Sequence, residues 1–205
     1  MKGVFTVKRK ILTALALVMA GLLSLALREE REFTRHGSAM NTLIRITVYS
    51  HSDDALNDAY SMLNDIDAKM SMFNPSSEIY KINELAGKKD FRPSKETLTV
   101  IQDSLKLYKI TDGVFNPLIG AVTKLWKINQ PTGVIPSQES IDIALNLTKI
   151  ENVSISADSV YLKHEGCFID LGGISKGYAS RAIADMLRHK GVKSAIIDLG
   201  GNIFA

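Results

Sequence analysis

The sequence predicts a mixed α/β (α+β) fold, and two kinds of hydrophobic periodicity predict it. Ile44, Ile46 and Val48 alternate with polar residues within residues 42–50, which is the two-residue period of a half-buried strand. Later segments repeat apolar side chains every three or four residues, which is the period of an amphipathic helix. A buried strand, a glycine turn, a helix and a second buried strand are then expected between residues 167 and 199.

Residues 1–27 are predicted to be a signal peptide or a membrane anchor. A basic group at residues 8–10 precedes the uncharged stretch 11–27, which is rich in Leu and Ala. A helix of that length spans about 25 Å, slightly less than the hydrocarbon core of a bilayer, so both alternatives stay open. The basic flank favours the inside of the cell. We therefore expect attachment to the inner (cytoplasmic) membrane, with the body facing the periplasm or the cell exterior.

The body of the chain is close to neutral. The whole chain has a net charge of +3, but residues 36–205 hold 18 of its 25 basic and 19 of its 22 acidic residues, a net charge of −1. A nucleic-acid-binding domain carries a basic face, so we expect no nucleic-acid partner. Residues 28–35 are charged and are predicted to link the membrane segment to a domain over residues 36–205. The single cysteine, Cys167, excludes an internal disulfide bond and has apolar neighbours typical of a core position.

Local signals place the helices and strands of the domain in order. A helix is expected after Ser52, with one apolar face; that face consists of Leu56, Ala59, Leu63, Ile66 and Met70. Further helices are expected after Ser94 and after Ser137, and weak strands near residues 152–156 and 159–163.

The last forty residues carry the clearest pattern. Residues 167–171 are predicted to be an apolar strand, Gly172-Gly173 a turn, and residues 175–190 a helix that Gly191 ends. Residues 195–199 are predicted to be a second buried strand. Residues 202–205 look like the opening of one more strand. We expect the domain to be C-terminally truncated, because a domain rarely ends inside an element that it needs.

The segment DLGGISKGYA, residues 170–179, is the strongest functional signal. Its glycines let a ligand approach the backbone closely, and the start of the following helix offers unpaired N–H groups that suit a phosphate. Lys176 adds a positive charge at the same place. Asp170 is a candidate to accept from a ribose or a ring N–H group, or to help hold a metal ion. The competing interpretation is a tight turn with a solvated lysine.

Two other segments have plain structural interpretations as well. A second DLGG segment, residues 198–201, is most simply interpreted as a turn between two strands. Asp198 is therefore a weaker candidate for a functional residue. Residues 111–118 combine a turn with an apolar anchor, which is the favoured interpretation, although such a loop also suits a flat ring. The four histidines lack the spacing of a zinc site.

Five motifs occur in the same order as in ApbE-type FAD:protein FMN transferases, and the chain resembles that family over nearly all of residues 36–205. The similar segments are AMNT at residues 39–42 (family AMGT), MSMF at 70–73 with Ser77, Glu78 and Asn83 (MS-aromatic, SE, N), TDGVFNP at 111–117 with Gly120 and Leu125-Trp126 (TxGxFDP, G, LW), DLGGISKGYA at 170–179 (DLGGIAKGYA) and LGGN at 199–202 (LGGD/N).

The resemblance implies a mixed α/β fold that binds FAD and Mg²⁺. It further implies Mg²⁺-dependent transfer of FMN from FAD to a threonine hydroxyl of a target flavoprotein in a redox or electron-transfer system, with release of AMP. Gly173 would offer its backbone carbonyl to the metal, and the remaining ligands are expected beyond Ala205. No residue is assigned as catalytic. The expected FAD contacts are Met40, Phe73, Val114, Phe115, Asn116, Asp170 and Lys176.

Three departures from the family pattern keep alternatives open. Asn41 replaces a usual Gly, with a possible change in the first turn, and Asn116 replaces a common Asp, which removes a charge near the flavin. The chain stops at Ala205, before the family's C-terminal Asp and Thr, so we expect it to be incomplete as a catalyst by itself. A non-catalytic or degenerate FAD-binding module and an FAD pyrophosphatase are the alternatives to the transferase.

Overall fold

The computed structural model describes residues 14–15, 17–19, 30–128, 130 and 133–205. The predicted signal or anchor segment, residues 1–27, lies largely outside these described residues. Among the residues that are described, no helix is both long enough and apolar enough to cross a membrane.

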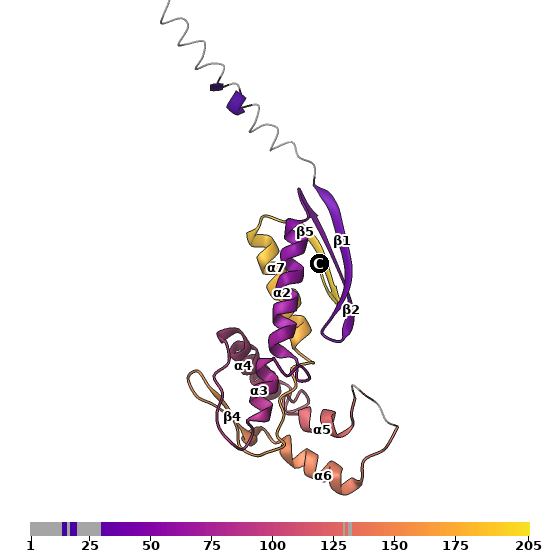
Figure 1. Cartoon of the computed structure of the whole chain (residues 1–205), viewed down its shortest axis with the longest axis vertical. Helices are drawn as coiled ribbons and strands as arrows, with labels where there is room; N and C mark the ends of the chain where they lie inside the picture. Colours follow the sequence, from indigo (N-terminus) through magenta and orange to yellow (C-terminus); the bar gives the residue numbers. More distant parts are fainter. Residues whose placement is uncertain (1–13, 16, 20–29, 129, 131–132) are drawn as a thin grey trace, which may run out of the picture.

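One antiparallel sheet and two helices form the upper body of the molecule (Figure 1). The strand order is β1-β2-β5-β6. Helix α2 (Asp54–Met70) packs on β1 and β2, while α7 (Ser175–His189) packs beside it on β5 and β6. The four strands are β1 (Arg31–Ala39), β2 (Thr42–Ser50), β5 (Ser194–Leu199) and β6 (Asn202–Phe204).

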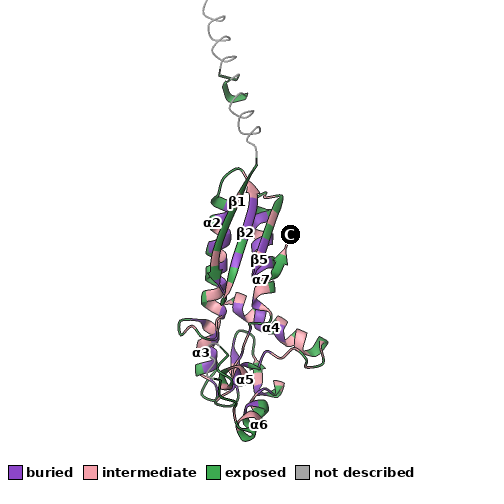
Figure 2. Cartoon of the chain, turned by 90° about the vertical axis from the view of Figure 1, so that its right-hand side faces the viewer, coloured by how far each residue is buried: buried purple, intermediate pink, exposed green. Residues whose placement is uncertain are grey.

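The core of this body lies between the sheet and the two helices, where Figure 2 colours the buried residues purple. Ile44, Ile46 and Val48 of β2 are buried, as their alternation predicts. All five apolar residues expected on one face of the first helix are buried as well. Burial of a large aliphatic side chain contributes about 1.5–3 kcal/mol, so this face accounts for much of the stability of α2.

A second region of short elements lies below the sheet in Figure 1. It contains a two-stranded ribbon of β3 and β4. Its elements are α3 (Glu78–Glu84), α4 (Lys95–Ile110), α5 (Gly120–Leu125), α6 (Gln138–Leu147), a 3₁₀ turn η1 (Ile150–Asn152), β3 (Val153–Ile155) and β4 (Val160–Leu162).

The helices expected after Ser52, Ser94 and Ser137 are all present, and serine caps two of them. Ser94 and Ser137 are the N-cap residues of α4 and α6, and each side chain accepts the N–H of the residue three positions on. Ser52 does not cap α2, because its hydroxyl donates to the carboxylate of Asp54 at 2.8 Å and the N-cap is Asp53.

The prediction of a linker over residues 28–35 is wrong for its second half. Residues 31–35 begin strand β1 and pair with residues 46–50 of β2. Most side chains of β1 are exposed, and within the described part of the chain it lies at an edge of the sheet, paired with β2 alone. Charged residues are common on such edges because they prevent further strand pairing, and they remove the alternation that identifies a strand from sequence.

The prediction of a strand at residues 167–171 is also wrong. The segment is extended, and Cys167, Ile169 and Leu171 are buried, but it pairs with no strand in the described chain. The side chain of Asn83 takes the place of a neighbouring strand. It accepts the N–H of Ile169 at 2.8 Å and donates to the carbonyl of Ile169 at 3.0 Å. Burial of the segment therefore leaves these backbone groups satisfied.

Candidate functional site

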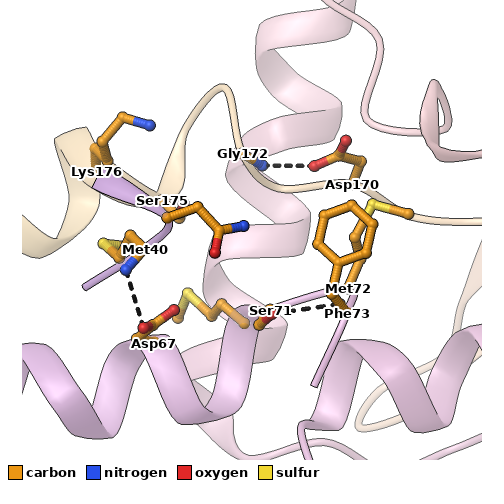
Figure 3. A pocket seen from close by; sticks show the side chains of 11 residues that line it. Met40, Asp67, Ser71, Met72, Phe73, Asp170, Gly172, Ser175 and Lys176 are labelled. Carbon is orange, nitrogen blue, oxygen red and sulfur yellow. Dashed lines mark hydrogen bonds between the residues drawn. The ribbon is translucent and has the colours of Figure 1, made fainter. Parts of the chain in front are cut away.

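Four segments meet around a small hollow where the sheet ends and the lower region begins (Figure 3). These are the β1–β2 turn, the end of α2 with residues 71–73, the extended segment before α7, and the first residues of α7. The hollow has a volume of about 70 Å³. It is lined by Met40, Asn41, Asp67, Met70, Ser71, Met72, Phe73, Asp170, Gly172, Ser175 and Lys176.

The start of α7 has two features that suit an anion, an uncapped helix N-terminus and a lysine. The N-cap residue, Ile174, makes no side-chain cap, so the first-turn amides and the helix dipole are not offset by a side chain. Lys176 lies in this first turn and is partly exposed. Within the described part of the chain, its ammonium group has no ion-pair or hydrogen-bond partner. A phosphate here would meet both the helix dipole and a free positive charge.

Asp170 lies on the other side of the hollow, and both of its carboxylate oxygens accept hydrogen bonds. Oδ1 accepts the N–H of Gly172 at 2.8 Å (Figure 3), and Oδ2 accepts the hydroxyl of Thr123 at 3.1 Å. Thr123 belongs to α5 and reaches Asp170 only through the fold. It stands between the motif residues Gly120 and Leu125, and no local pattern distinguishes it.

Met40 and Asn41 form the tight turn between β1 and β2. The pair Ala39–Thr42 closes the turn, and both central residues have positive φ, 52° and 57°. Such a turn matches the twist of the sheet and favours Gly or Asn. Asn41 therefore replaces the usual glycine without opening the turn, whereas Met40 is an uncommon residue in this conformation.

A larger hollow adjoins the first one, and Met72 and Phe73 line both. Its volume is about 570 Å³, within the range of small-molecule sites, whereas the first hollow is too small for a ring system. The ammonium of Lys124 lies 4.0 Å above the ring of Phe168, a cation–π contact. The other lining residues are Tyr80, Asn83, Glu84, Lys124, Lys127, Gln130 and Phe168.

Four of the seven predicted contact residues line the first hollow, namely Met40, Phe73, Asp170 and Lys176. The structure does not bring the other three into it. Val114 is 90% exposed. The ring of Phe115 packs on Gly173, where an added Cβ would lie 2.9 Å from it. The side chain of Asn116 donates to the Thr148 carbonyl and accepts the Leu118 N–H, both at 2.9 Å.

The described residues do not form a metal centre of their own. No three His, Cys, Asp or Glu side chains among them are grouped to hold a metal ion. The charged side chains in the first hollow are Asp67, Asp170 and Lys176, which give a net charge of −1. Asp198, the weaker candidate, accepts the N–H of Gly201 at 2.9 Å and lies 3.9 Å from Arg45, so its contacts are those of a turn residue.

Comparison with known proteins gives one consistent result. A family model described as the ApbE family matches residues 40–205. The chain is 28% identical over 177 residues to an FAD:protein FMN transferase of Klebsiella pneumoniae, covering 85% of this chain and 56% of the relative. It is 29% identical to the protein of the same name from Treponema pallidum, covering 85% and 52%. The chain thus spans about half the length of these curated relatives.

Solved structures show the same fold. The ApbE protein of Thermotoga maritima superposes with a TM-score of 0.77 at 27% identity, covering 84% of this chain and 58% of that one. The flavin transferase ApbE of Vibrio cholerae also gives a TM-score of 0.77, at 24% identity and with 84% and 59% coverage. The mixed α/β fold expected from the sequence is therefore confirmed.

Proposed function

The chain belongs to the ApbE family, and on that basis we propose that the protein is an FAD:protein FMN transferase. The reaction would move the FMN half of FAD to a threonine hydroxyl of a target flavoprotein and release AMP. One observation carries the proposal for this chain. The uncapped start of α7 and Lys176 meet Met40, Phe73 and Asp170 in one hollow, although these residues come from four separate segments.

The proposed step exchanges one phosphorus–oxygen bond for another. The threonine oxygen bonds to the phosphorus of the FMN half, the bond from that phosphorus to the bridging oxygen breaks, and AMP leaves with the electron pair. The threonine proton passes to solvent or to the leaving phosphate. Negative charge builds on the phosphoryl oxygens, and Lys176 with the α7 amides would stabilise it in place. This chain's other contribution is to position the two substrates.

The two adjoining hollows suit the two parts of a flavin dinucleotide. The hollow at α7 has room for little more than phosphate oxygens, whereas the larger one has room for a ring. Phe73 lies between them and is 38% exposed, so its ring is free to stack on a flat heterocycle. We place the diphosphate beside Lys176 and one ring system beyond Phe73.

A requirement for Mg²⁺ is part of the proposal, and its support is the charge of the hollow. A diphosphate would join a net charge of −1, so an additional cation is needed to offset it. The Gly173 carbonyl and the Asp170 carboxylate are oxygen donors of the kind that Mg²⁺ prefers, but the described residues contain no group of three His, Cys, Asp or Glu side chains that could hold the ion. The ion would offset phosphate charge when bound.

We also propose that the protein is attached to the inner membrane through residues 1–27, with its body facing the periplasm or the cell exterior. The support is the basic group followed by an uncharged apolar stretch. Fractionation of cells before and after removal of residues 1–27 tests this, and a soluble cytoplasmic body in the intact protein would contradict it.

The test of the proposed activity uses the full-length protein with FAD, Mg²⁺ and a threonine-bearing flavoprotein. We expect covalent flavin on the acceptor by mass spectrometry, AMP in the supernatant, and no labelling when the acceptor threonine is changed to alanine. FAD binding without any turnover would identify a non-catalytic flavin-binding module. Release of free FMN and AMP without an acceptor would identify an FAD pyrophosphatase.

A further inference from the structure

A hydrogen bond from the β1–β2 turn to α2 lies at the edge of the first hollow. The backbone N–H of Met40 donates to Oδ2 of Asp67 at 2.9 Å, and both residues line the hollow together with Lys176. Figure 3 shows Met40 above Asp67 at the end of the hollow nearest Lys176. The bond therefore ties the turn of the sheet to the helix that packs beneath it.

The turn needs such support because Met40 has a positive φ of 52°. In this left-handed region the Cβ of an ordinary L-residue approaches its own backbone, so Gly and Asn occupy it far more readily than Met. Strained residues of this kind persist where the surroundings hold them, and they cluster at ligand sites. Asn41 fits the turn by itself, so Met40 is the residue that requires a partner.

The place of Asp67 in its helix is unfavourable without the turn. It lies in the last turn of α2, and its own carbonyl accepts the N–H of the C-cap residue Ser71. A negative charge near a helix C-terminus opposes the helix dipole. The Met40 N–H is the hydrogen-bond donor that the described structure gives this carboxylate. Neither local propensity nor the helix dipole explains an aspartate here, whereas the turn does.

We propose that Asp67 is a positioning residue that holds the β1–β2 turn in its left-handed conformation and so keeps Met40 beside Lys176 at the phosphate end of the site. This inference rests on the proposed binding of FAD. Asp67 acts through Met40 and takes no part in the transfer.

The test combines three variants of the full chain with two measurements. Asp67→Ala removes the acceptor, Asp67→Asn keeps an acceptor oxygen without the charge, and Asp65→Ala removes an exposed aspartate from the same helix as a matched control. Solvent exchange of the Met40 amide, measured by NMR, reports the turn. The Kd for FAD, from flavin fluorescence, reports the site, and a thermal melt of each variant confirms that it is folded.

In Asp67→Ala we expect about tenfold faster exchange of the Met40 amide and about tenfold weaker FAD binding. For Asp67→Asn, the exchange rate of the Met40 amide and the Kd for FAD should both stay within about threefold of the wild-type values. Asp65→Ala should match the wild type in both quantities. Unchanged exchange in Asp67→Ala, or an Asp67→Asn variant as impaired as Asp67→Ala, would overturn the proposal. A wild-type protein that does not bind FAD would contradict the proposed function, and the exchange measurement would still decide the role of Asp67.

Discussion

The hydroxyl of Thr123 donates to Oδ2 of Asp170 at 3.1 Å, across a separation of 47 residues in the sequence. The other oxygen of Asp170 accepts the N–H of Gly172. These two bonds fix the plane of the carboxylate at the side of the hollow opposite Met40. Any contact between Asp170 and a ligand is therefore oriented in advance by α5.

Removal of the Thr123 hydroxyl should make the Asp170 side chain more mobile without unfolding the protein. For Thr123→Val we expect three- to tenfold weaker FAD binding and a loss of about 1 kcal/mol in the free energy of unfolding. Thr99→Val is the matched control, since the Thr99 hydroxyl donates to the backbone carbonyl of Lys95 at an exposed position of α4. Titration of FAD and denaturant melts measure the two quantities. An unchanged Kd in Thr123→Val would show that the orientation of Asp170 does not matter for binding.

The charge of Lys176 should matter for binding and little for stability. Lys176→Ala is expected to weaken FAD binding by about ten- to a hundredfold, because a charged contact to phosphate is lost. Its melting temperature should stay close to that of the wild type, since Lys176 has no partner within the described residues. Lys176→Arg should recover part of the affinity, and Lys95→Ala, at the start of α4, should leave it unchanged. Equal affinity of Lys176→Ala and wild type would rule out the phosphate site at α7.

The aromatic side chains of the larger hollow should contribute to the affinity for FAD. Loss of a ring-stacking partner costs about 0.5–1.5 kcal/mol, so we expect Tyr80→Ala to raise the Kd by about two- to tenfold. Tyr161→Ala removes a ring from β4, outside both hollows, and serves as the control. Competition with FMN and with AMP then identifies which ring occupies the hollow. A Tyr80→Ala variant with wild-type affinity would place the ring elsewhere.

Two glycines four residues apart should respond in opposite directions to alanine. At Gly173 the new Cβ would lie 2.9 Å from the ring of Phe115, so that ring must move, and we expect a loss of about 1–3 kcal/mol in stability. At Gly177 the nearest atom is 3.9 Å away, and alanine in α7 should gain about 0.5–1 kcal/mol. Urea unfolding of both variants measures the difference. If Gly173→Ala is as stable as the wild type, Phe115 is not packed on Gly173 in solution.

Stability at high pH should depend on Tyr178. Burial, together with the nearby carboxylate of Glu96 that accepts its hydroxyl at 3.2 Å, raises the pKa of Tyr178 to about 12. The unfolded chain ionises this phenol near pH 10, so its stabilising effect is complete below pH 10 and is lost between pH 10 and pH 12. We expect Tyr178→Phe to melt with a shallower pH dependence in that window. A parallel loss of melting temperature in both proteins would contradict the raised pKa.

Local signals account for much of the fold. Strand β2 and helix α7 lie where alternation, apolar spacing and a terminal glycine place them, and Ser94 and Ser137 cap the helices that follow them. Each of these signals acts between residues that are at most a few positions apart, so it can be recognised in the amino-acid sequence. The resemblance to the ApbE family was also carried by short motifs, and a family model that matches residues 40–205 confirms it.

Contacts between residues far apart in the sequence account for the elements that were predicted wrongly. Strand β1 owes its existence to pairing with β2, not to any apolar pattern, and its charged residues imitate a linker. The segment before α7 has the composition of a strand, yet Asn83, 86 residues away, satisfies its backbone groups in place of a neighbouring strand. Helices α3 and α5 were not expected, because elements of six or seven residues leave too few repeats for a period to be recognised.

The sequence by itself indicated where most helices and strands lie and which family the chain belongs to, and it predicts a phosphate site at residues 170–179. Only the tertiary structure decided that Met40, Phe73, Asp170 and Lys176 share one hollow while Val114 and Asn116 stay out of it. It alone revealed the hydrogen bonds that join Thr123 to Asp170 and Met40 to Asp67. The physical reason is the distance along the chain over which each interaction acts. Capping and periodicity act over one or two turns of chain, whereas a hydrogen bond between distant segments forms only after the sheet and its helices have packed.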